Sequence, residues 1–163
     1  MATGTSYFDT RRRIRANPHI RELAAGVHLS HRDFIQPLFV DEGISRRTQI
    51  PSLNEVYSDT PETLLQQIEE DLKEGVRKFL LFPVPAKKSE REFDFHFVQP
   101  VLQAIRKRFG SDVWVAADLC LCAYTIHGHC GLLSGDKTRV VNEETVPLLA
   151  AYALSLAQAG ADC

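Results

Sequence analysis

The residues best suited to chemistry lie in one short segment, residues 118–131, which reads DLCLCAYTIHGHCG. A strand predicted just before this segment carries side chains on alternating faces, so Asp118, Cys120 and Cys122 share one face if that strand continues through them. Asp118 is a candidate general acid or base, a contact for a substrate ammonium group or a partner of a metal ligand. A carboxylate that caps the loop amides is the structural alternative for the same residue.

The two cysteines separated by one residue favour a metal over a disulfide. Their Cα atoms would lie roughly 6.5 to 7 Å apart in an extended chain, close to the upper limit for a disulfide, with parallel Cβ vectors. Gly128 and Gly131 give the loop the freedom to turn back and bring Cys130 to the same place. Three thiolates with an open fourth position are typical of a catalytic zinc. Three unrelated buried cysteines are the simpler alternative.

Two histidines of the same loop, His127 and His129, offer a fourth ligand that would make the site structural rather than catalytic. Hydrogen bonding of each histidine to the loop, to a carboxylate or to substrate is the interpretation we favour. Cys163 belongs to no motif and is interpreted as an ordinary strand residue.

The elements that must position this segment alternate between apolar strands and helices. Strands are predicted at residues 34–40, 78–84 and 113–119. Helices are predicted from a cap at Asp59 or Thr60 to Gly75, within residues 95–109, and at residues 143–158 after a cap at Asn142. This order is typical of an α/β fold with a parallel sheet. The cysteines then follow the carboxyl end of a parallel strand, where barrel enzymes place their active sites.

Residues 31–163 hold about three βα units, whereas a (β/α)8 barrel typically needs about 250 residues. We therefore expect the first half of a barrel, truncated near residues 161–163, where another strand would start. A small three-layer α/β domain is the alternative. Residues 1–30 contain an arginine-rich stretch, Pro18 and a short helix that ends near Gly26, and they are predicted to form an arm.

Composition narrows the possible functions. Of the 163 residues, 44% are hydrophobic and 25% are charged, as in ordinary globular proteins. A net charge of -2 gives no general attraction to nucleic acid or to an anionic membrane, so the cluster at residues 11–15 is predicted to be solvated or to contact a subunit. No signal peptide and no apolar run of about 18 residues is evident. A cytosolic protein is expected, with an organelle transit peptide as the alternative, and its four cysteines are expected to be thiols or metal ligands.

The cysteine segment resembles that of a known family. DLCLCAYTIHGHCG closely resembles the zinc loop of porphobilinogen synthase, also called 5-aminolevulinate dehydratase, whose pattern is D-x-C-x-C-x-Y-T-x-H-G-H-C-G. RRRIRANP is similar to the family's arm, IQPLFV and LFPVP to its first two barrel strands, and NEETV with AGAD to its next helix and fourth strand. The resemblance covers nearly the whole chain from Arg11 and about half of the family's usual length. Residues 89–96 (SEREFDFH) depart from the family pattern.

The resemblance implies a (β/α)8 TIM barrel with an arm that embraces a neighbouring subunit in a large homo-oligomer, for which an octamer is expected. It implies a zinc-dependent lyase that condenses two molecules of 5-aminolevulinate into porphobilinogen with loss of water, in tetrapyrrole and haem biosynthesis. Cys120, Cys122 and Cys130 match the zinc thiolates of the family. Asp118 matches an active-site carboxylate beside the metal.

The two Schiff-base lysines of the family are not matched here. None of the candidate lysines lies in a corresponding motif: Lys73, Lys78, Lys87, Lys88, Lys107 and Lys137. Because covalent activation of substrate by a lysine amine is missing, we expect no turnover from this chain alone. The alternative function is a catalytically inactive zinc-binding fragment or isoform that associates with full-length subunits.

Overall fold

The computed structural model describes residues 12–163, and the chain divides into two compact units, Met1–Asp33 and Phe34–Cys163. The first unit ends close to the predicted arm boundary at residue 30. The predicted contact of this arm with a neighbouring subunit stays a prediction. Arg11, the first residue of the predicted arginine cluster, lies outside the described residues.

The described part of the first unit contains one short helix, α1 (Pro18–Leu23), between the 3-10 helices η1 (Arg13–Arg15) and η2 (His31–Asp33). Asn17 caps α1, because its side-chain oxygen accepts a hydrogen bond from the Ile20 amide at 2.9 Å. Pro18 suits the first helical position, where its missing N–H would have no partner within the helix.

The second unit is built on a five-stranded sheet with the strand order β2-β3-β1-β4-β5. The strands are β1 (Gln36–Asp41), β2 (Thr48–Gln49), β3 (Tyr57–Asp59), β4 (Lys78–Val84) and β5 (Trp114–Ala117). β3, β1, β4 and β5 are parallel, whereas β2 pairs antiparallel with β3 at the edge. The strand predicted at residues 78–84 is confirmed, and the other two predicted strands form with shifted ends. The short strands β2 and β3 were not predicted.

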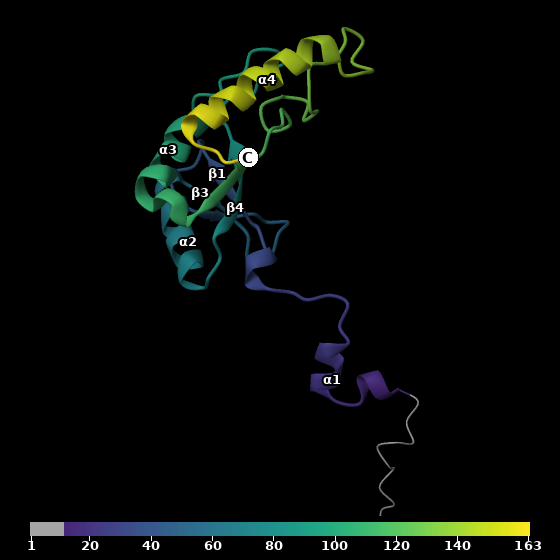
Figure 1. Ribbon diagram of the computed structural model, residues 1–163. Coiled ribbons are helices and arrows are strands. Elements are labelled where there is room, and N and C mark those ends of the chain that lie inside the picture. Colours follow the sequence, from purple (N-terminus) through teal and green to yellow (C-terminus); the bar gives the residue numbers. More distant parts are fainter. Residues whose placement is uncertain (1–11) are drawn as a thin grey trace, which may run out of the picture. The chain divides into compact units, whose positions relative to one another are not determined.

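Three helices accompany the sheet: α2 (Pro61–Lys73), α3 (Val98–Phe109) and α4 (Asn142–Ala159). Figure 1 shows α2 and α3 on the same side of the strands, and an ion pair between Arg108 and Glu69 joins them. The predicted cap at Asn142 is wrong by one position: Asn142 is the first helical residue, and Val141 is the cap without a side-chain hydrogen bond. Gly160 ends α4 with a left-handed backbone at φ 110°.

The hydrophobic core lies between the sheet and these helices. Alternate side chains of β4 are buried, as expected for a strand with one face against the core. The strands contribute Leu38, Val40, Phe79, Leu81 and Val115, and the helices contribute Leu64, Ile68, Leu102, Ile105, Tyr152 and Leu156. On the other face of the sheet, the rings of Phe39 and Phe82 stack with their centroids 5.1 Å apart.

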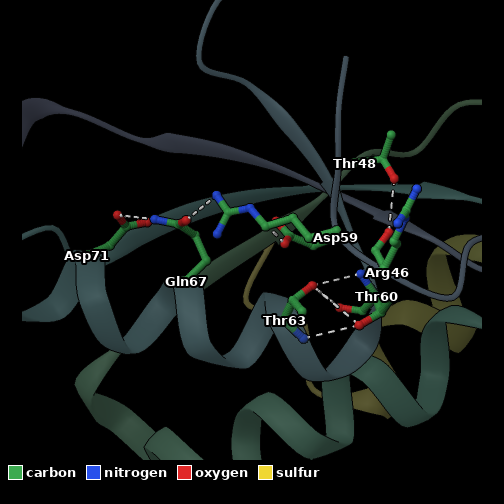
Figure 2. Close-up of polar contacts among 8 residues, drawn as sticks. Arg46, Thr48, Asp59, Thr60, Thr63, Gln67 and Asp71 are labelled. Atoms are coloured by element: carbon green, nitrogen blue, oxygen red, sulfur yellow. Dashed lines mark hydrogen bonds and ion pairs between the residues drawn. The ribbon is translucent and has the colours of Figure 1, made fainter.

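Helix α2 begins with a capping box, which Figure 2 shows in detail. The Thr60 hydroxyl accepts a hydrogen bond from the Thr63 amide at 3.2 Å, and the Thr63 hydroxyl accepts one from the Thr60 amide at 2.9 Å. Of the two predicted caps, Thr60 is therefore the one that forms.

A set of charged and polar side chains connects β3 to α2 and is called the β3–α2 network below. It consists of Arg47, Asp59, Gln67 and Asp71. Nε of Arg47 lies 3.4 Å from Oδ1 of Asp59, and its guanidinium donates to Oε1 of Gln67 at 2.5 Å. The Gln67 amide in turn donates to Asp71 at 2.8 Å (Figure 2).

Among residues 12–163, we find no helix that is both long enough and apolar enough to cross a membrane.

Candidate metal centre

The cysteine segment begins where β5 leaves the sheet. The Asp118 amide still donates to the Leu81 carbonyl of β4 at 2.9 Å, but the strand itself ends at Ala117. Beyond it, the amides of Tyr124 and Thr125 both donate to the Leu121 carbonyl at 2.9 Å, so the chain forms a turn rather than a ladder. The predicted strand through residue 119 and the shared strand face of Asp118 and the first two cysteines are therefore wrong.

The three cysteines nevertheless come together, and we call them the thiolate cluster. Sγ of Cys122 lies 3.1 Å from Sγ of Cys120 and 3.0 Å from Sγ of Cys130. All three sulfur atoms lie within 4.8 Å of one another. Cys130 is exposed and the other two are half-buried, which leaves the cluster open to solvent on one side.

Buried side chains hold this loop against the rest of the unit. Leu121, Tyr124 and Thr125 are at most 1% exposed. The Thr125 hydroxyl donates to the His129 carbonyl at 2.9 Å, which fixes the returning half of the loop. The buried side chains between the cysteines thus anchor the loop that carries the three sulfur atoms.

The two glycines of the loop serve different purposes. Gly128 has φ 74°, a left-handed conformation that glycine adopts without strain and that the return of the chain requires. Gly131 is needed for close packing, because a Cβ at this position would lie 2.6 Å from the side chains of Val140 and Thr145. The predicted role in turning the chain therefore applies to Gly128, and Gly131 brings the loop against α4.

The thiols of the cluster share their protons through hydrogen bonds. The hydrogen bond between Cys122 and Cys130 lowers the pKa of Cys130. The same bond raises the pKa of Cys122, and together with the hydrogen bond between Cys122 and Cys120 it brings that pKa to about 12. Cys130 is therefore the thiol that these contacts favour for deprotonation, and Cys122 is the one that they disfavour. A metal ion would replace these protons, since cysteine binds metals as the thiolate.

The remaining polar residues of the segment surround the cluster. Asp118 is half-buried, and burial raises the pKa of its carboxyl group. Nδ1 of His127 accepts a hydrogen bond from the His129 amide at 3.2 Å, and the two rings lie 5.3 Å apart. Among the described residues, the atoms that converge as possible metal ligands are the sulfur atoms of the three cysteines, and neither histidine is part of this group. This arrangement gives His127 a role in the hydrogen bonding of the loop.

The donor set fits a thiophilic metal ion. The two short S···S distances are too long for a disulfide of about 2.05 Å. Tetrahedral zinc with Zn–S bonds of about 2.3 Å holds its sulfur atoms nearly 4 Å apart, so the cluster needs to open by less than about 1 Å. Three thiolate ligands would leave the fourth coordination position of a tetrahedral zinc ion open to water or substrate.

Aromatic side chains that the sequence analysis did not single out pack against Tyr124 of the loop. The hydroxyl groups of Tyr124 and Tyr152 lie 3.0 Å apart and are buried. Phe95 stacks on Tyr152 of α4, with ring centroids 4.2 Å apart and an interplanar angle of 12°. Phe95 lies in the segment at residues 89–96 that departs from the family pattern, which was the signal that could have drawn attention to it.

Comparison with known proteins gives a consistent result. The family model for delta-aminolevulinic acid dehydratase matches residues 8–163. A protein of that name from Bacillus subtilis is 36% identical over 159 residues, which cover 95% of this chain and 48% of the Bacillus protein. Another from Ruminiclostridium josui is 39% identical over 155 residues, covering 93% of this chain and 74% of that relative.

A solved structure is similar as well. The crystal structure of delta-aminolevulinic acid dehydratase (porphobilinogen synthase) from Toxoplasma gondii, in complex with the reaction product porphobilinogen, matches with a TM-score of 0.85 at 30% identity. The match covers 94% of this chain and 45% of that structure. The chain therefore spans about half the length of the Toxoplasma and Bacillus proteins.

Proposed function

Since the chain belongs to the delta-aminolevulinic acid dehydratase (porphobilinogen synthase) family, we propose that it supplies the zinc-binding part of a porphobilinogen synthase active site. The reaction of that site is the condensation of two molecules of 5-aminolevulinate to porphobilinogen with loss of water, on the route to haem and other tetrapyrroles. The observation that carries the proposal is the convergence of three sulfur atoms within 4.8 Å, beyond the carboxyl end of β5.

Cys120, Cys122 and Cys130 would hold the zinc ion, and Asp118 would act beside it. A bound zinc ion supplies Lewis acidity toward a carbonyl or amine of the substrate. Asp118 is the candidate to accept or donate a proton there, and burial raises the pKa of its carboxyl group. The covalent activation of substrate by lysine amines would come from residues outside this 163-residue sequence.

A metal titration of the 163-residue chain tests the zinc site. Co²⁺ should bind at one ion per chain and give an intense thiolate-to-metal charge-transfer band, and Zn²⁺ should displace it. Cys122→Ser should abolish this band. Cys163→Ser is the matched control, since Cys163 is exposed and does not belong to the cluster. Absence of a Co²⁺–thiolate band in the unaltered chain, or equal loss in both variants, would contradict the proposal.

A turnover assay tests the division of the active site. The isolated chain, free of any full-length enzyme, should form no porphobilinogen from 5-aminolevulinate even when it is loaded with zinc. Detectable turnover that scales with the concentration of the chain would show that it carries the covalent part of the site as well.

The first unit is proposed to serve as an arm that contacts a neighbouring subunit in a homo-oligomer, with an octamer as the expected assembly. Its described residues support this role, because Ile14, Leu23, Val27 and Leu29 are between 65% and 88% exposed. Large exposed apolar residues in one segment favour an interaction surface. Removal of residues 1–30 should lower the number of subunits per particle in analytical ultracentrifugation, and an unchanged number of subunits would contradict the role.

A cytosolic location is proposed on the basis of the cysteines. All four are free thiols, which are maintained in a reducing compartment. Fractionation of cells that produce the protein should place it with soluble cytosolic enzymes, and recovery in an organelle would favour the transit-peptide alternative.

The second candidate function is that of a catalytically inactive zinc-binding partner of full-length subunits. It is favoured by an apolar hollow between β5 and α4 that is lined mainly by Ala117, Leu119, Ala153, Leu156 and Ala157. Leu119 remains 44% exposed there. Under co-expression, the chain should co-purify with a full-length dehydratase subunit. Failure to co-purify would remove this candidate.

A further inference from the structure

Tyr124, two residues after Cys122, belongs to a set of aromatic rings that we call the aromatic clamp: Phe93, Phe95, Tyr124 and Tyr152. We propose that Tyr152 of α4 is a positioning residue for the metal centre, which it controls through its hydrogen bond to Tyr124 and its stacking on Phe95. The inference rests on the proposed function of the cluster as a metal site and adds the residue that sets the geometry of its ligands.

The contacts of Tyr152 are those of a fixed support. Its side chain is fully buried, and its hydroxyl lies 3.0 Å from that of Tyr124, which is itself 1% exposed. The Phe95 ring stacks on Tyr152 and meets Tyr124 edge-on, with ring centroids 5.2 Å apart. Three rings from three parts of the chain thus fix one another, because offset-stacked and edge-on pairs favour defined orientations.

Tyr124 carries this constraint to the cysteines. It lies two residues after Cys122 in the same turn, where its amide donates to the Leu121 carbonyl at 2.9 Å. Its own carbonyl accepts a hydrogen bond from the Ser89 amide at 2.9 Å, which ties the turn to the segment after β4. A displacement of the Tyr124 ring therefore shifts the backbone that positions Cys122, the cysteine whose sulfur contacts both others.

The hydroxyl pair makes the clamp sensitive to small changes. A buried polar group that loses its partner is costly, whereas replacing both partners by apolar groups of the same shape can be nearly neutral. Tyr152→Phe would leave the Tyr124 hydroxyl buried without this partner and so push Tyr124 from its place. The double variant Tyr124→Phe/Tyr152→Phe keeps all rings and leaves no orphaned hydroxyl.

Co²⁺ and Zn²⁺ affinities of the 163-residue chain test the proposal. Tyr152→Phe should weaken binding about tenfold, in the range found when the groups that support metal ligands are altered, and should change the Co²⁺–thiolate spectrum. The double variant should recover an affinity within about threefold of the unaltered chain. Tyr57→Phe is the matched control, since Tyr57 lies on β3 and should leave both affinity and spectrum unchanged.

The outcomes separate the two proposals. If the unaltered chain binds neither ion, the metal site itself is wrong. If the unaltered chain binds but Tyr152→Phe has the same affinity and spectrum, or if the losses in the double variant simply add, Tyr152 is not a positioning residue. Circular dichroism checks that each variant is folded. Should Tyr152→Phe fail to fold, Tyr124→Phe removes the other end of the same bond and gives the equivalent test.

Discussion

The thiolate cluster and the β3–α2 network are both groups of polar side chains, but the groups that partner these side chains differ. In the network, the Arg47 guanidinium lies beside the Asp59 carboxylate, and Gln67 links it to Asp71. In the cluster, three cysteine sulfur atoms face one another, and hydrogen bonds between them are their contacts with each other. We therefore expect the network to bear on folding, and we expect the cluster of like donors to take up a cation from solution.

The network is itself incompletely balanced. Burial raises the pKa values of Asp59 and Asp71 despite the nearby arginine. Oδ1 of Asp59 and Oδ2 of Asp71 are buried without a hydrogen bond, so the carboxylates depend on Arg47 and Gln67 for their compensation. We therefore expect substitutions in the network to change folding stability, and substitutions in the cluster to change metal binding.

The largest expected effect is the completion of the cluster by metal. Free Zn²⁺ at about 1,000 times its Kd should raise the free energy of unfolding by about 4 kcal/mol, because the ion binds the folded state. Thermal or urea denaturation with and without zinc measures this change. Cys122→Ser should lose the stabilisation and Cys163→Ser should keep it. An equal response of both variants would mean that zinc acts elsewhere.

The next effect comes from the network. Arg47→Leu should lower the free energy of unfolding by about 3 kcal/mol at neutral pH, since it leaves the Asp59 carboxylate buried without its counter-charge. Urea denaturation measures the loss. Arg46→Leu is the matched control, because Arg46 is exposed.

The effect of Arg47→Leu on the free energy of unfolding should depend on pH in a defined way. A carboxyl group whose pKa is raised in the folded state favours folding at low pH, and this contribution is lost as the pH rises through the folded-state pKa. Without Arg47, the pKa of Asp59 should rise further. The penalty of Arg47→Leu should therefore shrink from about pH 7 to about pH 4. A penalty that is constant over this range would show that Asp59 is not the group responsible.

The two regions also differ in how far the sequence predicted them. The cysteines lie within eleven residues of one another in a recognisable pattern, so the cluster was predicted although the strand face invoked for it does not exist. The apolar run through Leu119 suggested a longer strand, but the amides after Asp118 bond within a turn instead. Whether these residues form a strand or a turn depends on the hydrogen-bond partners that the folded chain offers them. The periodicity of the sequence does not show those partners.

The network could not be predicted because its members are brought together by β3. This strand has only three residues, and it forms because β1 offers it a parallel edge. By contrast, α2 and α3 follow from apolar residues at helical spacing, and the capping residue of α2 was among those predicted. Long local patterns are therefore visible in the sequence, whereas short strands and the contacts they create depend on the whole fold.

An intermediate effect is expected where the cluster meets α4. Gly131→Ala should lower the free energy of unfolding by about 2 kcal/mol, because the new methyl group would overlap Val140 and Thr145. It should also weaken zinc binding, since the loop must shift next to Cys130. Denaturation and zinc titration measure the two effects. Gly135→Ala in the same loop is the control, because a Cβ there meets no atom within 4 Å and the backbone is not left-handed.

The smallest effect should separate the two regions most cleanly. Thr60→Ala removes the capping box of α2, the helix that carries Gln67 and Asp71, and should lower the free energy of unfolding by about 1 kcal/mol. Thr60→Ser keeps a capping hydroxyl and should restore most of this loss. Thr48→Ala should have little effect, because its hydroxyl bonds only an exposed carbonyl in the described contacts. Since Thr60 has no contact with the cluster in the described structure, zinc affinity should be unchanged in all three variants. A weaker zinc affinity in Thr60→Ala that Thr60→Ser restores would mean that α2 and the metal loop are coupled, and that the network is part of the support of the metal centre.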